Sequence, residues 1–167
     1  MHREDGPAIE WADGKKEWYK NGIKQRIEYE DETKIWYENN RVHREDGPAS
    51  ESVDGSMAWY INGLRHRKDG PARVLSNGDE EWYINGMLHR ENGPARVLSN
   101  GDEEWYINGQ LHRVDGPAIE RADGTQEWYM NNLKHREGGP AIERADGTQE
   151  WYINGKLYNR WTYYRLV

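Results

Sequence analysis

Residues 112–134 read HRVDGPAIERADGTQEWYMNNLK, and residues 135–157 read HREGGPAIERADGTQEWYINGKL. The two stretches agree at most positions and follow each other at a step of 23 residues. The histidine that opens them recurs at the same step, at His43, His66, His89, His112 and His135. Self-similarity at a fixed period of about 20–50 residues is the signature of a repeat architecture, so this stretch decides the fold.

The repeats account for nearly the whole chain of 167 residues. They span residues 2–24, 25–42, 43–65, 66–88, 89–111, 112–134 and 135–157, followed by an atypical segment at residues 158–167. The second repeat has only 18 residues and lacks the histidine and the Asp-Gly-Pro-Ala segment, which fits either a neutral deletion or a functional kink. Because the end of an array needs its open edge covered, the atypical segment is predicted to be a cap. We therefore expect a single repeat domain over residues 1–167.

Two turn signals recur along the chain. Asp-Gly or Asn-Gly pairs, which we expect to form two-residue turns with positive φ, lie at residues 13–14, 54–55, 77–78, 100–101, 123–124 and 146–147. A second set of Asn-Gly pairs lies at residues 21–22, 62–63, 85–86, 108–109 and 154–155. The short segments between the turns suit strands, and a Gly or Pro every few residues argues against helices. The sequence therefore predicts an all-β fold, in which tandem β-hairpins form one elongated, twisted antiparallel sheet.

Each repeat carries a Trp-Tyr pair, as at Trp105 and Tyr106. Because successive strand residues face opposite sides, the two residue types are expected to form columns on opposite faces. Aliphatic residues are scarce, so we expect Trp to build the core together with Pro and Ala. Tyr is the better candidate for an exposed partner-binding strip, since Tyr, Trp and Arg are enriched in binding hot spots. The tyrosines predicted to form this strip are Tyr60, Tyr83, Tyr106 and Tyr129.

Two adjacent central repeats carry acidic triplets at the same place, namely Asp79, Glu80 and Glu81, and Asp102, Glu103 and Glu104. The common interpretation of such a run is a solvated face. As a partner-binding site it would instead steer a protein with a basic surface toward the array. If that partner bound nucleic acid, the triplets could block its site, so a stoichiometric inhibitor is one form that the function could take.

The composition excludes several classes of protein. Thirty Asp and Glu against 23 Lys and Arg give a formal net charge of −7, which argues against direct nucleic-acid binding. Nine Trp and 11 Tyr argue against disorder, and the lack of Cys excludes disulfides and thiolate metal sites. No apolar run reaches the roughly 20 residues that cross a bilayer, and the first residues do not resemble a signal peptide. We therefore expect a soluble, cytoplasmic protein.

The recurring His and Arg are candidates for chemistry. Equivalent histidines on successive repeats would lie about 10 Å apart, whereas zinc needs ligands that converge on one point at about 2.0–2.1 Å. No metal site, catalytic site or cofactor is therefore predicted, and each histidine is expected to be a loop residue that bonds its own turn. The arginine that follows it is expected to bridge neighbouring repeats. Its functional alternative is a row of cations that holds an acidic segment or a lipid phosphate.

The run Tyr106-Ile107-Asn108-Gly109-Gln110-Leu111-His112, followed by Asp123-Gly124, resembles the MORN repeat. The resemblance covers essentially the whole chain in seven copies. In this chain Tyr106 takes the place of the family's Trp, and H-R-x-D-G-P stands where the family has H-G-x-G. The resemblance implies an elongated sheet of hairpins that binds proteins, with lipid binding in some members and no shared enzyme activity. Similar arrays in phages, large viruses and bacteria suggest such an origin.

Three functional hypotheses follow from these patterns. The favoured one is a non-enzymatic protein–protein interaction module that acts as a rigid scaffold, adaptor or stoichiometric inhibitor. The alternative is a repeat that binds a glycan or an acidic lipid through its aromatic or Arg columns. An enzyme that uses His and Asp is the third and weakest. An open sheet also has two unpaired edges, which allow a homodimer.

Overall fold

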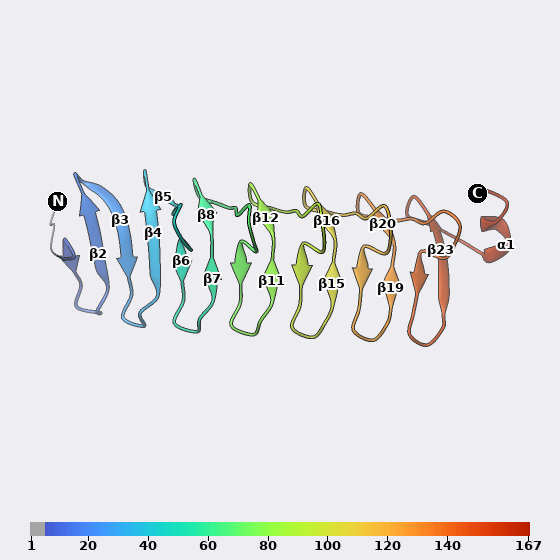
Figure 1. Ribbon diagram of the computed structural model, residues 1–167, viewed down its shortest axis with the longest axis horizontal. Coiled ribbons are helices and arrows are strands. Elements are labelled where there is room, and N and C mark those ends of the chain that lie inside the picture. Colours follow the sequence, from blue (N-terminus) through green and yellow to red (C-terminus); the bar gives the residue numbers. More distant parts are fainter. Residues whose placement is uncertain (1–5) are drawn as a thin grey trace. The chain divides into compact units, whose positions relative to one another are not determined.

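The computed structural model describes residues 6–167, and these residues form 24 short β-strands and one helical turn (Figure 1). All strand pairs are antiparallel, and successive hairpins pair edge to edge. The predicted all-β fold of tandem antiparallel hairpins is confirmed. His2 and Arg3, which open the first repeat, lie outside the described residues. No helix among residues 6–167 has the length and apolar character that crossing a bilayer requires.

The contacts divide the chain into two compact blocks, residues 1–87 and residues 88–167. In the N-terminal block the strands follow the sheet order β1-β2-β3-β4-β6-β7-β10-β11. Their bounds are β1 (Ile9–Glu10), β2 (Lys16–Lys20), β3 (Ile23–Glu28), β4 (Lys34–Glu38), β6 (Ser50–Glu51), β7 (Met57–Ala58), β10 (Arg73–Val74) and β11 (Glu80–Glu81). Beside this sheet lie β5 (Arg41–Val42), which pairs with β4, and the hairpin of β8 (Tyr60–Ile61) and β9 (Leu64–Arg65). The next such hairpin begins with β12 (Tyr83–Ile84), and its second strand, β13 (Met87–Leu88), contains the division between the blocks.

The C-terminal block repeats this arrangement with the sheet order β14-β15-β18-β19-β22-β23-β24. The bounds are β14 (Arg96–Val97), β15 (Glu103–Glu104), β18 (Ile119–Glu120), β19 (Gln126–Glu127), β22 (Ile142–Glu143), β23 (Gln149–Ile153) and β24 (Lys156–Tyr158). The small hairpins of this block are β16 (Tyr106–Ile107) with β17 (Gln110–Leu111) and β20 (Tyr129–Met130) with β21 (Leu133–Lys134). The helical turn α1 (Arg160–Tyr163) follows β24.

Within a full repeat, the chain leaves the sheet at the tryptophan. Trp128, between β19 and β20, donates its backbone N–H to Ala141 O of the following repeat at 2.8 Å. The chain then turns back through the small hairpin β20–β21, and His135 donates its backbone N–H to Trp128 O at 3.0 Å. The H-R-x-D-G-P loop next returns the chain to the sheet at Ala141. Each tryptophan therefore connects its own hairpin to the next repeat.

The two turn signals form different turns. At Asn62-Gly63 both residues have positive φ, 53° and 84°, as a two-residue type I′ turn requires. At Asp54-Gly55 only the glycine has positive φ, 87°, and Ser52 pairs across the loop with Ser56. This is a three-residue loop, in which a left-handed glycine follows an ordinary turn. The predicted two-residue turn is therefore confirmed for the second set, at Asn21, Asn62, Asn85, Asn108 and Asn154. It is wrong for the first set, including Asn77-Gly78 and Asn100-Gly101, where only the glycine has positive φ. In that set Asp54 accepts the Ser56 N–H at 2.9 Å.

The shortened second repeat runs straight through the sheet. Without an H-R-x-D-G-P loop, the six-residue strand β3 pairs along one side with β2 and along the other with β4. A register shift between Trp18 and Tyr19 accommodates the missing segment. Gln25 stands where other repeats have His, and Arg26 still lies over Trp18. The deletion therefore removes a loop without interrupting the sheet.

The repeated alanines are the most buried residues of the array. Ala49, Ala72, Ala95, Ala118 and Ala141 are each 0% exposed. The tryptophans that precede the tyrosines are half-buried, in contrast to the core role expected from the sequence. The alanine begins each return to the sheet and is bonded through its backbone to neighbouring segments on both sides, as Ala141 is to Trp128 and Glu150. The tryptophan lies where the chain leaves the sheet. The sheet therefore does not cover one face of its ring, and another side chain has to pack there.

The C-terminal segment packs onto the last loop of the array. Asn159 caps α1 by accepting the Thr162 N–H at 2.9 Å. Tyr163 is 0% exposed. Its hydroxyl donates to Arg136 O and accepts the Gly139 N–H at 3.1 Å. These contacts satisfy backbone groups of the Arg136–Gly139 loop.

Candidate functional site

Within each block, most of the half-buried tryptophans are covered by the arginine that lies eight residues further along the chain. The guanidinium carbon lies close to the ring centroid in five such pairs, one of which is Arg26 over Trp18 at 3.9 Å. The other distances are 4.3 Å for Arg44 over Trp36, 4.0 Å for Arg67 over Trp59, 3.9 Å for Arg113 over Trp105 and 3.7 Å for Arg136 over Trp128. Trp151 differs, because Asn159 stands at that place and the Arg160 guanidinium lies 6.0 Å from the ring centroid. A guanidinium on an indole face combines cation–π attraction with stacking. The recurring arginine is therefore part of the framework, in agreement with its expected structural role.

The H-R-x-D-G-P loop holds this arginine in place. Arg136 Nη1 donates to Pro140 O at 3.0 Å and to the Glu143 carboxylate at 2.6 Å. The guanidinium also lies against Gly139, where an added Cβ would lie 3.0 Å from Arg136 Cζ. A side chain at this position would therefore require the guanidinium to shift.

The histidines connect neighbouring turns and do not gather into a metal site. The N–H of the asparagine 19 residues later donates to Nδ1 in four repeats, with distances of 3.1 Å from Asn62 to His43, 3.2 Å from Asn85 to His66, 3.1 Å from Asn108 to His89 and 3.2 Å from Asn154 to His135. His112 Nδ1 lies 2.9 Å from Asn131 Oδ1. The structural role expected for His is present, but the bonded turn is the next Asn-Gly turn of the array rather than the turn that precedes the histidine. Residues 6–167 contain no cluster of His, Asp and Glu that could hold a metal ion.

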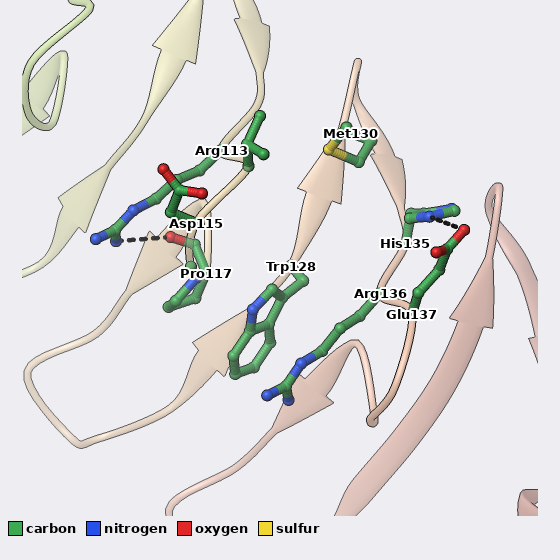
Figure 2. A pocket seen from close by; sticks show the side chains of 10 residues that line it. Arg113, Asp115, Pro117, Trp128, Met130, His135, Arg136 and Glu137 are labelled. Atoms are coloured by element: carbon green, nitrogen blue, oxygen red, sulfur yellow. Dashed lines mark hydrogen bonds and ion pairs between the residues drawn. The ribbon is translucent and has the colours of Figure 1, made fainter. Parts of the chain in front are cut away.

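A groove opens between successive H-R-x-D-G-P loops, and Figure 2 shows the one in the C-terminal block. Its volume is about 710 Å³. The loop around Arg113 and Pro117 forms one wall, while His135, Arg136 and Glu137 form the other. Trp128 lies between the walls, with Arg136 along its ring (Figure 2). The groove therefore combines the aromatic ring of Trp128 with charged side chains of both signs.

The N-terminal block has an equivalent groove of about 870 Å³. Arg44, Pro48, Trp59, His66 and Arg67 line it at the positions that Arg113, Pro117, Trp128, His135 and Arg136 hold in the other block. Sequence reasoning considered these residue types only in separate columns. It missed the grooves because the loops approach one another across a full repeat, and that spacing depends on the turn geometry.

The groove rims carry exposed carboxylates. The side chains of Glu45, Asp46 and Glu137 are 86%, 84% and 78% exposed. The Arg44 guanidinium, 2.9 Å from Asp46, lowers the pKa of that carboxyl below its usual value. The wall arginines bond to loop carbonyls and to carboxylates such as Glu51. Asp46 also bonds to Arg44, but most of its carboxylate still faces solvent. The accessible charge at the rims is therefore mainly negative.

The predicted tyrosine strip is half-buried, and most of its hydroxyls are used within the array. The tyrosine hydroxyl donates to a glutamate two residues earlier in five repeats, at 2.7 Å for Tyr19–Glu17, 3.1 Å for Tyr83–Glu81, 3.0 Å for Tyr106–Glu104, 3.1 Å for Tyr129–Glu127 and 2.8 Å for Tyr152–Glu150. Burial, followed by the charge of Glu127, raises the pKa of Tyr129 far above its ordinary value. Burial likewise raises the pKa of Tyr83. Tyr60 has no such glutamate, because Ala58 takes that position.

Some members of the acidic triplets bond within the array, and others are partly exposed to solvent. Glu81 and Glu104, the last members, bond to Arg73 at 3.1 Å and to Arg96 at 3.3 Å. Asp102 accepts the Ala122 N–H at 2.9 Å and lies 3.5 Å from Arg121. Asp79 donates its N–H to Asn77 in the turn. The middle members, Glu80 and Glu103, are half-exposed, so the free negative charge of the triplets is smaller than the sequence suggests.

The sequence matches no protein-family model, and no curated protein matches it at a significant level.

Proposed function

We propose that this protein is a non-enzymatic protein-binding module, a MORN-like array that serves as a scaffold, adaptor or stoichiometric inhibitor. The observation that carries the proposal is the recurrence of one groove, built from the same residue types, in both blocks. A surface that repeats in this way suits an extended partner that makes the same contact several times. Trp and Arg, which line each groove, are also the residues that supply most of the energy at protein interfaces.

The charges of the grooves favour a partner with basic side chains. The wall arginines are engaged by Pro48 O and Glu51, or by Pro140 O and Glu143. The rim carboxylates remain exposed, so a Lys or Arg of a partner can pair with them while its aliphatic part covers the tryptophan. Such pairs would set specificity and the rate of association more than raw affinity.

A pull-down from lysate of the source cells, treated with nuclease and washed at high salt, tests the proposal. The wild-type protein should retain one protein in stoichiometric amount, identified by mass spectrometry. Asp115→Lys combined with Glu137→Lys reverses two rim charges of the C-terminal groove and should weaken retention. The control combines Glu10→Lys with Glu30→Lys, which changes the net charge equally outside the two grooves and should retain the partner.

The outcomes separate the proposal from its alternatives. No stoichiometric protein in the wild-type sample would contradict a protein-binding function. Binding of a glycan array or of acidic vesicles in that case would establish the ligand-binding alternative. Equal loss with both double variants would show that net charge governs retention and that the grooves do not.

A further inference from the structure

The third repeat, residues 43–65, lacks one of the charges that the other full repeats carry. Ala58 stands where Glu17, Glu81, Glu104, Glu127 and Glu150 accept the tyrosine hydroxyl. The shortened repeat also lacks this glutamate, but there Ile35 fills the position and Val42 lies opposite Tyr37. In the third repeat the replacement is small, and the residue opposite Tyr60 is the cation Arg65.

The strand position opposite the tyrosine is occupied by a cation at Lys24, Arg65 and Lys134. Among these three, Arg65 alone has no carboxylate partner within the described residues. Lys24 reaches Glu17 at 3.8 Å, and Lys134 reaches Glu127 at 4.0 Å. Arg65 Nε instead donates to the Tyr60 hydroxyl at 3.2 Å. Its guanidinium lies 5.3 Å from the centroid of the Tyr83 ring. The half-buried Arg65 guanidinium thus contacts two tyrosines, whereas Lys24 and Lys134 each pair with a glutamate.

The missing side chain leaves a pocket of about 300 Å³. Its polar lining consists of Ser50, Ser52, Asp54, Ser56, Tyr60, Arg65 and Arg73. In the sheet, Ser50 and Arg73 lie directly on either side of Ala58, where Ile119 and Ile142 flank Glu127. Two apolar neighbours have therefore been replaced by a hydroxyl and a second guanidinium, and that guanidinium bonds to Glu81 at 3.1 Å.

The hydrogen-bonding groups of the pocket are mainly donors. Tyr60 accepts from Arg65, which leaves its own O–H free to donate, and the Ser50 and Ser52 hydroxyls bond to no other described group. Asp54 is the one carboxylate among the described lining residues, and it accepts from the Ser56 hydroxyl at 3.0 Å and from the Ser76 hydroxyl at 3.2 Å. A half-buried cation beside unused donors is matched by an anion.

We propose that this pocket binds a carboxylate of an acidic peptide segment. The ligand carboxylate takes the place of the glutamate that Ala58 lacks, pairs with the Arg65 guanidinium and accepts the Tyr60 O–H. It thereby completes the arrangement that Glu127, Tyr129 and Lys134 make within one chain. This inference does not depend on the grooves, because it concerns a separate pocket and the chemistry of its ligand.

The repeats supply variants for the test. Arg65→Leu introduces the residue found at Leu111, Ala58→Glu introduces the common glutamate, and Ser50→Ile introduces the residue found at Ile119. Because each residue already occurs at the equivalent place in this fold, the variants are expected to fold. Ala58→Glu should fill the pocket from within and raise the melting temperature through a new ion pair with Arg65.

The probes are capped pentapeptides with one central Glu or Gln, and a tetraglycine with a free C-terminal carboxylate. Titration is followed by NMR at Arg65 Nε–H. We expect saturable shifts with the Glu peptide and at least about tenfold weaker binding with the Gln peptide or with Arg65→Leu. Ala58→Glu and Ser50→Ile should abolish binding. Tetraglycine binding equal to that of the Glu peptide would assign the ligand to chain termini, and weaker binding would assign it to acidic side chains.

Three results would overturn the inference. They are the absence of saturable shifts, equal binding of the Glu and Gln peptides, and unchanged binding by Ala58→Glu. None of them bears on the groove experiment above, so the two proposals fail separately.

Discussion

Glu32 adopts a backbone conformation that glycine holds elsewhere in the array. Its φ is 66°, and its N–H donates to Tyr29 O just as the Gly55 N–H donates to Ser52 O. A left-handed conformation costs a residue with a Cβ roughly 1–2 kcal/mol, and glycine avoids that cost. The acidic run at residues 28–32 therefore contains a strained turn position.

Glu32→Gly is expected to stabilise the protein by about 1 kcal/mol, since relief of strain exceeds the extra freedom that glycine has in the unfolded chain. Urea unfolding followed by Trp fluorescence measures the gain. Glu32→Ala is the matched control because it removes the same charge while keeping the Cβ, and it should give no such gain. If both variants stabilised the protein equally, the gain would come from removing the Glu32 charge and not from relief of backbone strain.

Gly116 is the second residue whose identity the structure explains. A Cβ here would lie 2.9 Å from Arg113 Cζ, so the guanidinium would leave its place over Trp105. We expect Gly116→Ala to destabilise the protein by about 1–3 kcal/mol. A double-mutant cycle with Arg113→Ala provides the check, because in that background the alanine methyl finds open space and costs little. If Gly116→Ala destabilised the Arg113→Ala protein as much as the wild type, the alanine methyl would not be clashing with Arg113.

At the scale of the hairpin, Trp and His contribute unequally to the contacts between repeats. The Trp105 indole carries the Arg113 guanidinium at 3.9 Å. His112 contributes one side-chain contact, to Asn131. Trp105→Ala is expected to cost about 2–4 kcal/mol, and His112→Ala about 0.5–1.5 kcal/mol. Small and equal shifts of the melting temperature would contradict this ranking.

Hairpin geometry could be predicted from the sequence only where local chemistry determines it. Asn followed by Gly favours two left-handed residues, so the type I′ turn at Asn62 was predictable, although at Asn77-Gly78 only the glycine has positive φ. The Asp-Gly loops add one residue because the side chain of Asp54 bonds the backbone beyond the glycine. That choice between two loops of similar sequence depends on the register of the flanking strands, which sequence alone does not provide.

The candidate sites were less predictable than the fold. The groove around Trp128 forms between loops a full repeat apart, and the bond from His43 to Asn62 spans 19 residues. The pocket near Ala58 did have a signal in the sequence. When the repeats are aligned, one position loses its glutamate while the cation Arg65 remains. The pairing of Tyr60 with Arg65 was needed to show that these two positions adjoin.

Across the whole chain, carboxylates act as hydrogen-bond acceptors for backbone and basic groups. The Lys15 ammonium lowers the pKa of Glu17, the Arg144 guanidinium lowers that of Glu150, and the backbone N–H of Ser56 lowers that of Asp54. Because these pKa values are lower in the folded chain than in the unfolded chain, the stability they provide is complete above the ordinary values. It is lost as the pH falls through the lowered values.

We therefore expect constant stability near neutral pH and a progressive loss below the ordinary glutamate pKa of about 4.5. Urea unfolding at a series of pH values measures this dependence. Glu150→Gln removes one of the contributing groups and should flatten the acid limb of the curve. A midpoint independent of pH between about 5 and 3 would show that these contacts contribute no net stability.

The Asn-Gly turns also determine where the protein undergoes spontaneous deamidation. Asparagine before glycine deamidates when the glycine nitrogen attacks the asparagine Cγ and closes a succinimide ring. In the array that nitrogen is restrained, since Gly63 donates its N–H to Val42 O at 2.8 Å and Gly155 donates to Lys134 O at 2.9 Å. The Gly22 N–H makes no equivalent bond to an earlier turn within residues 6–167. Each repeat therefore protects the turn that follows it, and spontaneous deamidation begins at Asn21.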